Sequence, residues 1–164
     1  MTPQHMVPTF NSPLEAGIRA ISILLPAFPQ AYDLQRLVVF DHLIVHTGDM
    51  GGPESLHPQL PLRSTEILVR RKLVERGLLL MMSRGLVERI INTNGISYCA
   101  GEFAATFQSA LTSPYIIALR ERGDWVVNTF GTLDDSTLRK TMSAFFGQWI
   151  DEFHATQRSL EVRL

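Results

Sequence analysis

The sequence is poor in cysteine and has no long apolar run, and each absence excludes a class of protein. Cys99 is the only cysteine among 164 residues, so no disulfide can form within the chain. A single cysteine is typical of a reducing compartment. Residues Met1 to Phe10 lack the basic start and apolar core of a signal peptide. The longest apolar run, Leu78 to Met82, is much too short to cross a bilayer. We therefore expect a cytoplasmic protein that does not enter a membrane.

The chain also lacks a dominant charge and the motifs of phosphate chemistry. Its 15 Lys and Arg residues against 16 Asp and Glu residues give a formal net charge of −1. A chain-wide binder of polyanions is excluded, and any contact with nucleic acid would depend on a local patch. No glycine-rich loop leads into a lysine and a hydroxyl residue, and there is no dinucleotide-binding fingerprint. We expect no cofactor, no small-molecule substrate and no enzymatic activity.

What the chain does contain is a series of amphipathic helices with recognisable ends. Apolar residues at helical spacing predict helices over 12–25, 33–48, 64–84, 102–111, 113–130 and 134–153. Ser12, Asp33 and Ser113 are suitable caps for three of these helices. Pro26 and Pro29 are expected to end the first helix. Gly77 leaves open whether the third is one helix or two helices joined by a tight turn.

A hairpin follows the third helix. Leu86 to Ile91 and Ile96 to Ala100 are predicted strands, joined through Asn94-Gly95, the strongest short signal of a hairpin. A helix that runs directly into a hairpin is typical of a winged helix-turn-helix. The predicted fold is therefore mainly α with a small β-hairpin, a winged helix-turn-helix with additional flanking helices. The predicted organisation is a flexible arm over 1–11, a winged helix-turn-helix core over 12–111, a helical extension over 112–154 packed on the same domain, and a tail over 155–164.

Polar residues near the second helix raise a catalytic hypothesis. His42 and His46 lie four residues apart, as metal ligands on a helix can, with Asp41 and Asp49 nearby. No glutamate follows His42 in the pattern of a zinc hydrolase, so helix-end histidines are the favoured interpretation and a metal-dependent hydrolase is a minor alternative. Cys99 has no histidine or basic neighbour that would lower the pKa of its thiol, so we expect a small core residue.

The connection over 47–62 carries three glycines and three prolines and shows no periodicity. Long connections of this kind are often functional. Ser55 and His57 suggest a nucleophile and a base, but no strand-turn-helix elbow positions the serine. We expect a protein contact here, with Glu54, Ser55, Leu56 and His57 as the interface residues.

The window from Arg63 to Arg89 is locally basic, with seven cations against three glutamates. It covers the predicted helix-turn-helix and the start of the wing, the elements that meet phosphates and the major groove in DNA-binding winged helices. The candidate DNA-contacting residues are Arg70, Arg71, Lys72, Arg76 and Arg84. The alternative is a solvated helix face with ordinary i,i+4 ion pairs, and the predicted wing tip over 92–95 has no positive charge.

Three stretches carry a resemblance to a known family. They are Phe10-Asn11-Ser12-Pro13-Leu14-Glu15-Ala16-Gly17-Ile18-Arg19-Ala20, the run from Tyr32 that ends in Gly51-Gly52-Pro53-Glu54-Ser55-Leu56-His57-Pro58, and Leu68-Val69-Arg70-Arg71 through Arg84-Gly85-Leu86-Val87-Glu88-Arg89. Over about residues 10–130 the sequence resembles the middle component of bacterial ABC-three-component systems, of which Lamassu-type defence is an example. The resemblance implies an SMC-like ABC ATPase and an effector, often a nuclease, as partners in defence against phage or plasmids. It supplies no catalytic residue.

Two functions follow. In the first, the chain is a non-catalytic winged-helix adaptor that links the ATPase to the effector or helps the ATPase to engage DNA. In the second, it is a free-standing DNA-binding transcriptional regulator, as the basic window suggests. The near-neutral charge, the 47–62 connection and the resemblance favour the adaptor. If DNA contact exists, Arg70→Glu with Arg71→Glu is expected to abolish it and to leave folding nearly intact.

Overall fold

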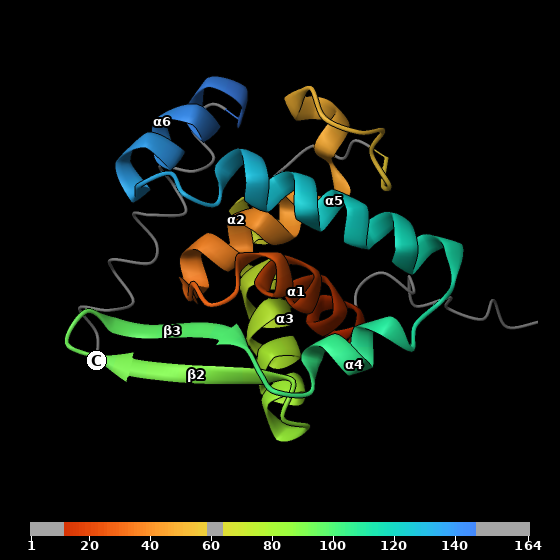
Figure 1. The fold of residues 1–164 in the computed structure, drawn as a ribbon. Helices are drawn as coiled ribbons and strands as arrows, with labels where there is room; N and C mark the ends of the chain where they lie inside the picture. Colours follow the sequence, from red (N-terminus) through yellow and green to blue (C-terminus); the bar gives the residue numbers. More distant parts are fainter. Residues whose placement is uncertain (1–11, 59–63, 147–164) are drawn as a thin grey trace, which may run out of the picture.

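Ten segments of regular structure follow one another along residues 12–58 and 64–146, the part of the chain that the computed structural model describes (Figure 1). They are α1 (Pro13–Ala27), β1 (Tyr32–Asp33), α2 (Leu34–Val45), the 3₁₀ helix η2 (Thr47–Met50), α3 (Ser64–Ser83), β2 (Val87–Asn92), β3 (Gly95–Ala100), α4 (Ala104–Ser109), α5 (Pro114–Phe130) and α6 (Asp135–Phe146). The prediction of a mainly helical chain with a small antiparallel sheet is confirmed. The predicted arm over 1–11, the tail over 155–164, Arg63 and the end of the last predicted helix lie outside the described residues.

Three helices begin where their capping side chains predict. Ser12, Asp33 and Ser113 each accept a hydrogen bond from the backbone N–H three residues later, at 3.2, 2.8 and 3.4 Å. These side chains satisfy N–H groups that the start of a helix leaves without an intrahelical partner. In α1 and α5 a proline follows the cap and presets the helical backbone.

α1 includes Pro26 and ends at Ala27, before Pro29, so the helix ends between the two prolines that are predicted to end it. A proline has no N–H for the carbonyl four residues earlier, which is that of Ser22. In this fold α5 packs on that carbonyl, and a Cβ at Gly123 would lie 2.1 Å from the Ser22 oxygen. α5 therefore packs on the carbonyl group that receives no helical hydrogen bond from Pro26.

α3 is one unbroken helix through Gly77, so the tight turn considered at this residue is absent. Gly77 is needed for packing instead, because α1 crosses α3 at this point. A Cβ at Gly77 would lie 2.7 Å from the Gly17 nitrogen and 2.9 Å from the Pro13 carbonyl oxygen. The two glycines together let the backbones of α1 and α3 approach closely.

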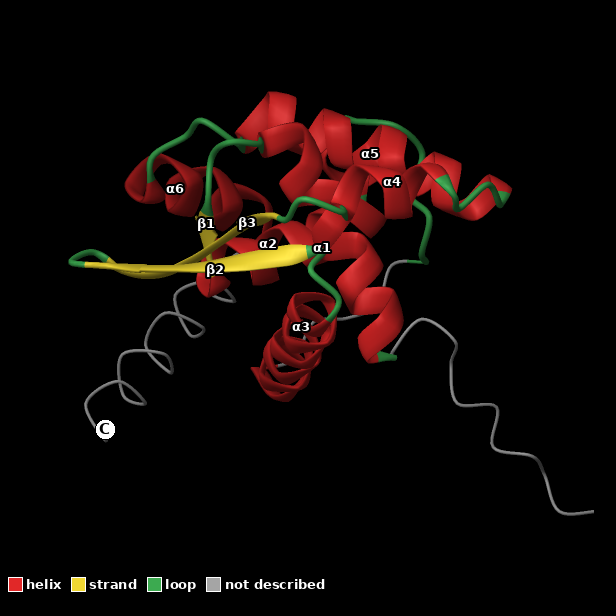
Figure 2. Ribbon diagram, turned by 60° about the horizontal axis from the view of Figure 1, so that its bottom comes forward, coloured by secondary structure: helices red, strands yellow, loops and turns green. Residues whose placement is uncertain are grey.

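The predicted hairpin forms and gains a third strand. β2 and β3 pair antiparallel with Val87 opposite Ala100 and Ile91 opposite Ile96, and the strand order is β1-β3-β2 (Figure 2). β1 pairs with β3 through Tyr32, opposite Tyr98, and through the next residue, Asp33. Two residues have no hydrophobic period, so the sequence gives no signal of this strand.

α1 lies at the centre of the molecule and contacts α2, α3, α4, α5 and β3 (Figure 1). Its residues Ile21, Ile23 and Leu24 are fully buried, as are Phe40 and Leu43 of α2. α5 adds Leu119 and Val126 to the same cluster of buried side chains. α6 adds Leu138 and Met142, so the core joins all six α-helices of the described residues, with the small sheet along one side.

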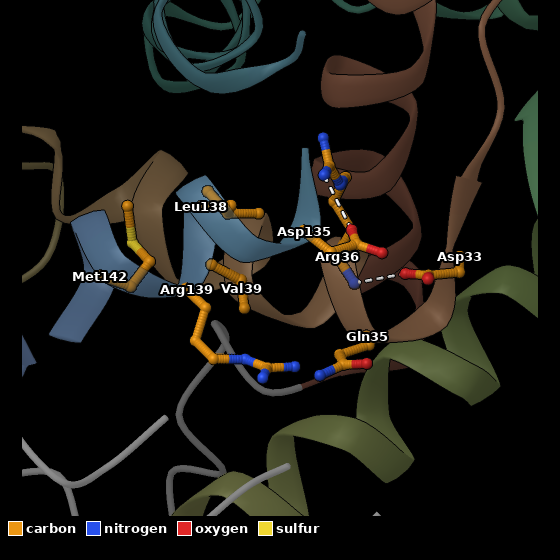
Figure 3. Close-up of a pocket in the computed structure, with 8 residues that line it drawn as sticks. All are labelled: Asp33, Gln35, Arg36, Val39, Asp135, Leu138, Arg139 and Met142. Carbon is orange, nitrogen blue, oxygen red and sulfur yellow. Dashed lines mark hydrogen bonds and ion pairs between the residues drawn. The ribbon is translucent and has the colours of Figure 1, made fainter. Parts of the chain in front are cut away.

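Arg36 of α2 fixes the start of α6. Its buried guanidinium donates to the carbonyl oxygens of Gly131 and Leu133 at 3.3 and 2.6 Å and to the Asp135 carboxylate at 2.9 Å (Figure 3). The pocket beside it has a volume of about 60 Å³.

Candidate functional site

A buried ion-pair cluster lies where α3 packs on α1 and α2. Asp41 of α2 accepts from Arg19 Nε at 2.7 Å on one carboxylate oxygen and from Arg70 Nη1 at 2.5 Å on the other. Burial would raise the pKa of Asp41, but the two guanidinium groups outweigh it and hold the pKa below its ordinary value. The cluster ties α1, α2 and α3 together through one carboxylate.

This cluster changes the role of a predicted DNA-contacting residue. Arg70 is not a solvated cation, because its guanidinium serves Asp41, whose side chain is almost completely buried. Arg70→Glu would place a second carboxylate beside Asp41. It is therefore expected to destabilise the fold, contrary to the prediction that this substitution leaves folding nearly intact.

Three histidines lie next to the ion-pair cluster. The rings of His42 and His46 are 4.4 Å apart between centroids, and His57 from the following loop lies 6.3 Å from His46. His57 Nε2 is 2.9 Å from the Tyr115 hydroxyl of α5. Burial lowers the pKa of all three histidines, and nearby arginines lower it further, to about 4 for His57. At neutral pH the three imidazoles are uncharged.

The geometry of these groups gives the hydrolase hypotheses little support. Among residues 12–58 and 64–146, no group of three or more His, Cys, Asp or Glu side chains is arranged to hold a metal ion. Ser55 Oγ accepts from the Gly48 N–H at 3.0 Å, while His57 bonds to Tyr115. The serine and the histidine are thus held by different partners. Cys99 is buried, in agreement with its prediction as a small core residue.

The loop after α2 is held by its own backbone. The N–H groups of Leu56 and His57 both donate to the Val45 carbonyl oxygen, at 3.1 and 3.0 Å. Thr47 Oγ1 donates to the Pro53 carbonyl oxygen at 2.7 Å. These bonds fold the loop back on the end of α2, and they require no partner protein.

α5 holds the other side of this loop. Arg122 donates from Nε and Nη2 to the Glu54 carbonyl oxygen, at 2.9 and 2.7 Å. Gly52 packs on Trp125, where a Cβ would lie 2.6 Å from the ring. Of the four predicted interface residues, Glu54 is exposed and Ser55, Leu56 and His57 are half-buried. The loop is thus a rigid part of the domain surface, and its use by a partner stays a prediction.

The remaining predicted DNA-contacting residues lie on or just after α3. Lys72, Arg76 and Arg84 are exposed. Arg71 is half-buried and lies 3.5 Å from the Glu75 carboxylate, an ordinary i,i+4 pair. The structure thus brings Lys72 and Arg76 together on the outward side of α3 and separates Arg70 from them.

Exposed apolar side chains on α3 and the hairpin were not singled out from the sequence. They are Leu68 (39% exposed), Val69 (66%), Leu79 (57%), Ile90 (37%), Ile91 (69%) and Ile96 (48%). A signal for those on α3 is present, because the apolar residues of 64–84 surround the helix and do not fit one face. For the hairpin, an alternating pattern would have placed one of the adjacent residues Ile90 and Ile91 outward.

Comparison with known protein families decides the affiliation of the chain. A sequence profile of the ABC-three component (ABC-3C) system Middle Component 2 matches residues 9–152. The chain belongs to this family. Comparisons with curated proteins and with solved structures found no match. Membership makes the chain an accessory component of a multi-component system, which implies protein partners. No helix among the described residues has the length and apolar character needed to cross a membrane.

Proposed function

We propose that this Middle Component 2 chain is a non-catalytic, cytoplasmic winged-helix adaptor. In this proposal it links an SMC-like ABC ATPase to an effector protein, such as a nuclease, in a defence system of the Lamassu type that acts against phage or plasmids. The observation that carries the proposal is the family match over 9–152, because one component of a three-component system is expected to act together with the others.

The order of elements supports the winged-helix part of the proposal. α1, β1, α2, α3, β2 and β3 follow one another, and β1 joins the β2–β3 hairpin to form a sheet of order β1-β3-β2. A helix that leads directly into a hairpin is the arrangement in which winged helices present a recognition helix and a wing. The helix-turn-helix would then consist of α2 and α3 with a long connection over 46–63, and not of two halves of 64–84.

Co-purification tests the adaptor function. The tagged chain is expressed with the products of its neighbouring genes, captured, and washed at rising salt concentration. We expect an ATPase of the SMC-like class to be retained through high salt and to be identified by mass spectrometry. Purification of the chain alone, with none of the neighbouring products retained at any salt concentration, would contradict the proposal.

A free-standing DNA-binding regulator is the second candidate function. It is favoured by the exposed Lys72 and Arg76 on α3 and by Arg84 directly after it. A regulator of this kind is expected to be a dimer that binds DNA on its own, with an affinity that falls steeply with salt. Absence of DNA binding by the isolated chain at low salt would exclude it.

A further inference from the structure

We propose that α3 and the hairpin together bind an acidic, amphipathic helix of a protein partner. The surface consists of Leu68, Lys72 and Leu79 on α3 and of Arg89, Ile91 and Ile96 on the hairpin, and we call it the α3–hairpin surface. The inference rests on the proposed adaptor function and names the place and the chemistry of its partner contact.

The residues of α3 share one side of the helix. Leu68, Lys72, Glu75 and Leu79 follow at intervals of three and four, which places them in one row. The helix buries Val74, Leu78 and Met81 against the core, and the row lies away from them. The row therefore presents the apolar Leu68 and Leu79 and the basic Lys72 to solvent, together with Glu75, whose carboxylate pairs with Arg71.

The hairpin residues of this surface lie on the face of the hairpin that packs against the core at its base. Val87 and Ala100 are opposite each other and buried, and side chains two and four residues further along each strand lie on the same face. This places Arg89 opposite Tyr98, and Ile91 opposite Ile96, on that face. From Tyr98 towards the turn, the core no longer covers this face, so Ile91 and Ile96 are exposed.

Tyr98 connects the two rows. Tyr98 is half-buried against the core cluster that includes Val74 and Leu78 of α3, so the Tyr98 face of the hairpin adjoins this helix. The charge of Glu75 on α3 accordingly adds to burial in raising the pKa of the Tyr98 phenol, against Arg89, which lowers it. Figures 1 and 2 show the hairpin projecting sideways from the end of α3 and not lying along it. The two rows therefore border an inside corner between helix and hairpin.

The composition of this corner favours protein over DNA. Ile91 is 69% exposed and Leu79 is 57% exposed, and neither can bind a phosphate. Interfaces with DNA are strongly basic and polar, whereas exposed apolar patches with a charged rim mark protein contacts. Lys72 and Arg89 place positive charge beside the apolar residues, and the negative charge of Glu75 is paired with Arg71 at 3.5 Å. A helix with an apolar stripe flanked by Asp or Glu has the matching chemistry.

The test uses two isoleucines that are neighbours in β2. Ile91→Glu puts a carboxylate on the proposed surface, and Ile90→Glu puts the same group on the opposite face of the same strand. Leu79→Glu tests the α3 row, and Lys72→Glu, compared with Lys140→Glu on α6, tests the charge. Circular dichroism first establishes that each variant is folded.

Binding is measured with the products of the neighbouring genes, after nuclease treatment. We expect Ile91→Glu, Leu79→Glu and Lys72→Glu to weaken retention of the partner by about tenfold or more, as substitutions at interface centres do. Ile90→Glu and Lys140→Glu are expected to retain it as the unchanged chain does. A photo-crosslinker at position 91 is expected to label a partner segment with an apolar stripe flanked by Asp or Glu.

Each other outcome overturns the inference in a distinguishable way. Retention of the partner by all five variants would reject the surface and leave the adaptor function intact. Failure of the unchanged chain to retain any neighbouring product would reject both. Loss of the partner on nuclease treatment would show that DNA bridges the two proteins, and crosslinking from position 91 to a second copy of this chain would make the surface a dimer interface.

Discussion

Asp41 is the carboxylate that neutralises two arginines in the interior of the fold. Its two carboxylate oxygens serve Arg19 and Arg70, which come from different helices. A buried carboxylate shared by two cations cannot be removed without leaving both cations uncompensated, and breaking a buried pair costs several times more than losing a surface pair.

Asp41→Asn is therefore expected to lower the free energy of unfolding by about 3–5 kcal/mol, the usual loss when one partner of a buried pair is removed. Chemical denaturation measures this difference. Glu75→Gln is the matched control, because it breaks the exposed pair with Arg71 and should cost about 0.5 kcal/mol or less. Equal losses in the two variants would show that the Asp41 cluster contributes no more than a surface pair.

The histidines beside Asp41 give the fold a pH dependence of predictable sign. Burial holds the pKa of His57 at about 4, below its ordinary value of 6.5, and lowers the pKa of His42 and His46 as well. The unfolded chain therefore binds protons first as the pH falls. Stability is expected to decrease from about pH 6.5 towards pH 4.

The measurement is the thermal unfolding midpoint at a series of pH values between 7.5 and 4. In His57→Gln the midpoint should fall less over this range than in the unchanged chain, because one of the three histidines no longer titrates. The lowered pKa of Asp41 acts in more acidic solution, since a depressed carboxylate pKa contributes stability that is lost only below about pH 4. An identical pH profile for the two chains would contradict this account of His57.

Among the elements, α3 depends on what lies beside it more than on its own sequence. Gly77 weakens a helix by about 1 kcal/mol relative to alanine, yet α3 passes through it without interruption. The reason is the backbone of α1 at Gly17, which a Cβ at Gly77 would meet at 2.7 Å. The gain of packing α1 on α3 exceeds the loss of helix propensity.

Gly77→Ala is accordingly expected to destabilise the fold although alanine favours helices. Forcing an extra methyl group into packed surroundings costs roughly 1–3 kcal/mol, and here the neighbours are backbone atoms that cannot rotate away. Arg76→Ala, one residue earlier and exposed, should change stability by about 0.5 kcal/mol or less. A stability gain in Gly77→Ala, measured by denaturant titration, would show that α1 can move away.

Features with a local cause could be predicted from the sequence, and features with a distant cause could not. The caps Ser12 and Asp33 act within three residues, and the hairpin turn depends on Asn94-Gly95. The sequence alone therefore predicts both the helix starts and the hairpin. β1 exists because Tyr32 meets Tyr98, and a two-residue strand has no pattern of its own. The continuity of α3 likewise depends on a helix that precedes it by many residues.

The same distinction applies to the candidate site. Of the five cations predicted to contact DNA, the structure places Lys72, Arg76 and Arg84 on the surface, and the DNA contact itself stays a prediction. A count of cations along the sequence could not separate Arg70 from them, because the partner of Arg70 is Asp41 on another helix. The exposed isoleucines of the hairpin were overlooked because an apolar strand is usually taken as core, and its exposure depends on how far the strand extends beyond the helices.

For the molecule as a whole, the charge distribution limits what DNA can contribute. The net charge is −1, and the exposed cations over residues 68–92 are Lys72, Arg76, Arg84 and Arg89. Each phosphate contact contributes about −0.9 to the slope of log affinity against log salt. Four cations therefore allow a slope no steeper than about −4.

Titration of a short fluorescent duplex with the isolated chain, at several salt concentrations, measures this slope. We expect binding to be weak and confined to low salt, and Arg76→Ala to reduce the slope by about 1. A slope near −8 would require a larger basic surface than α3 and the hairpin offer, and it would favour the regulator over the adaptor.

The hairpin is attached to the rest of the molecule at one end, in the manner of a cantilever. Val87 and Ala100 are held in the core, and the last pair with β1 is Asp33 opposite Ser97. From there the two strands continue alone to the turn at Asn94-Gly95, roughly 10 Å further at about 3.3 Å per residue. A partner that binds at the turn would therefore act on the hairpin far from its attachment. Its pull at the turn would be transmitted to the base of the hairpin, where β2 meets the end of α3, and would be larger there than at the turn.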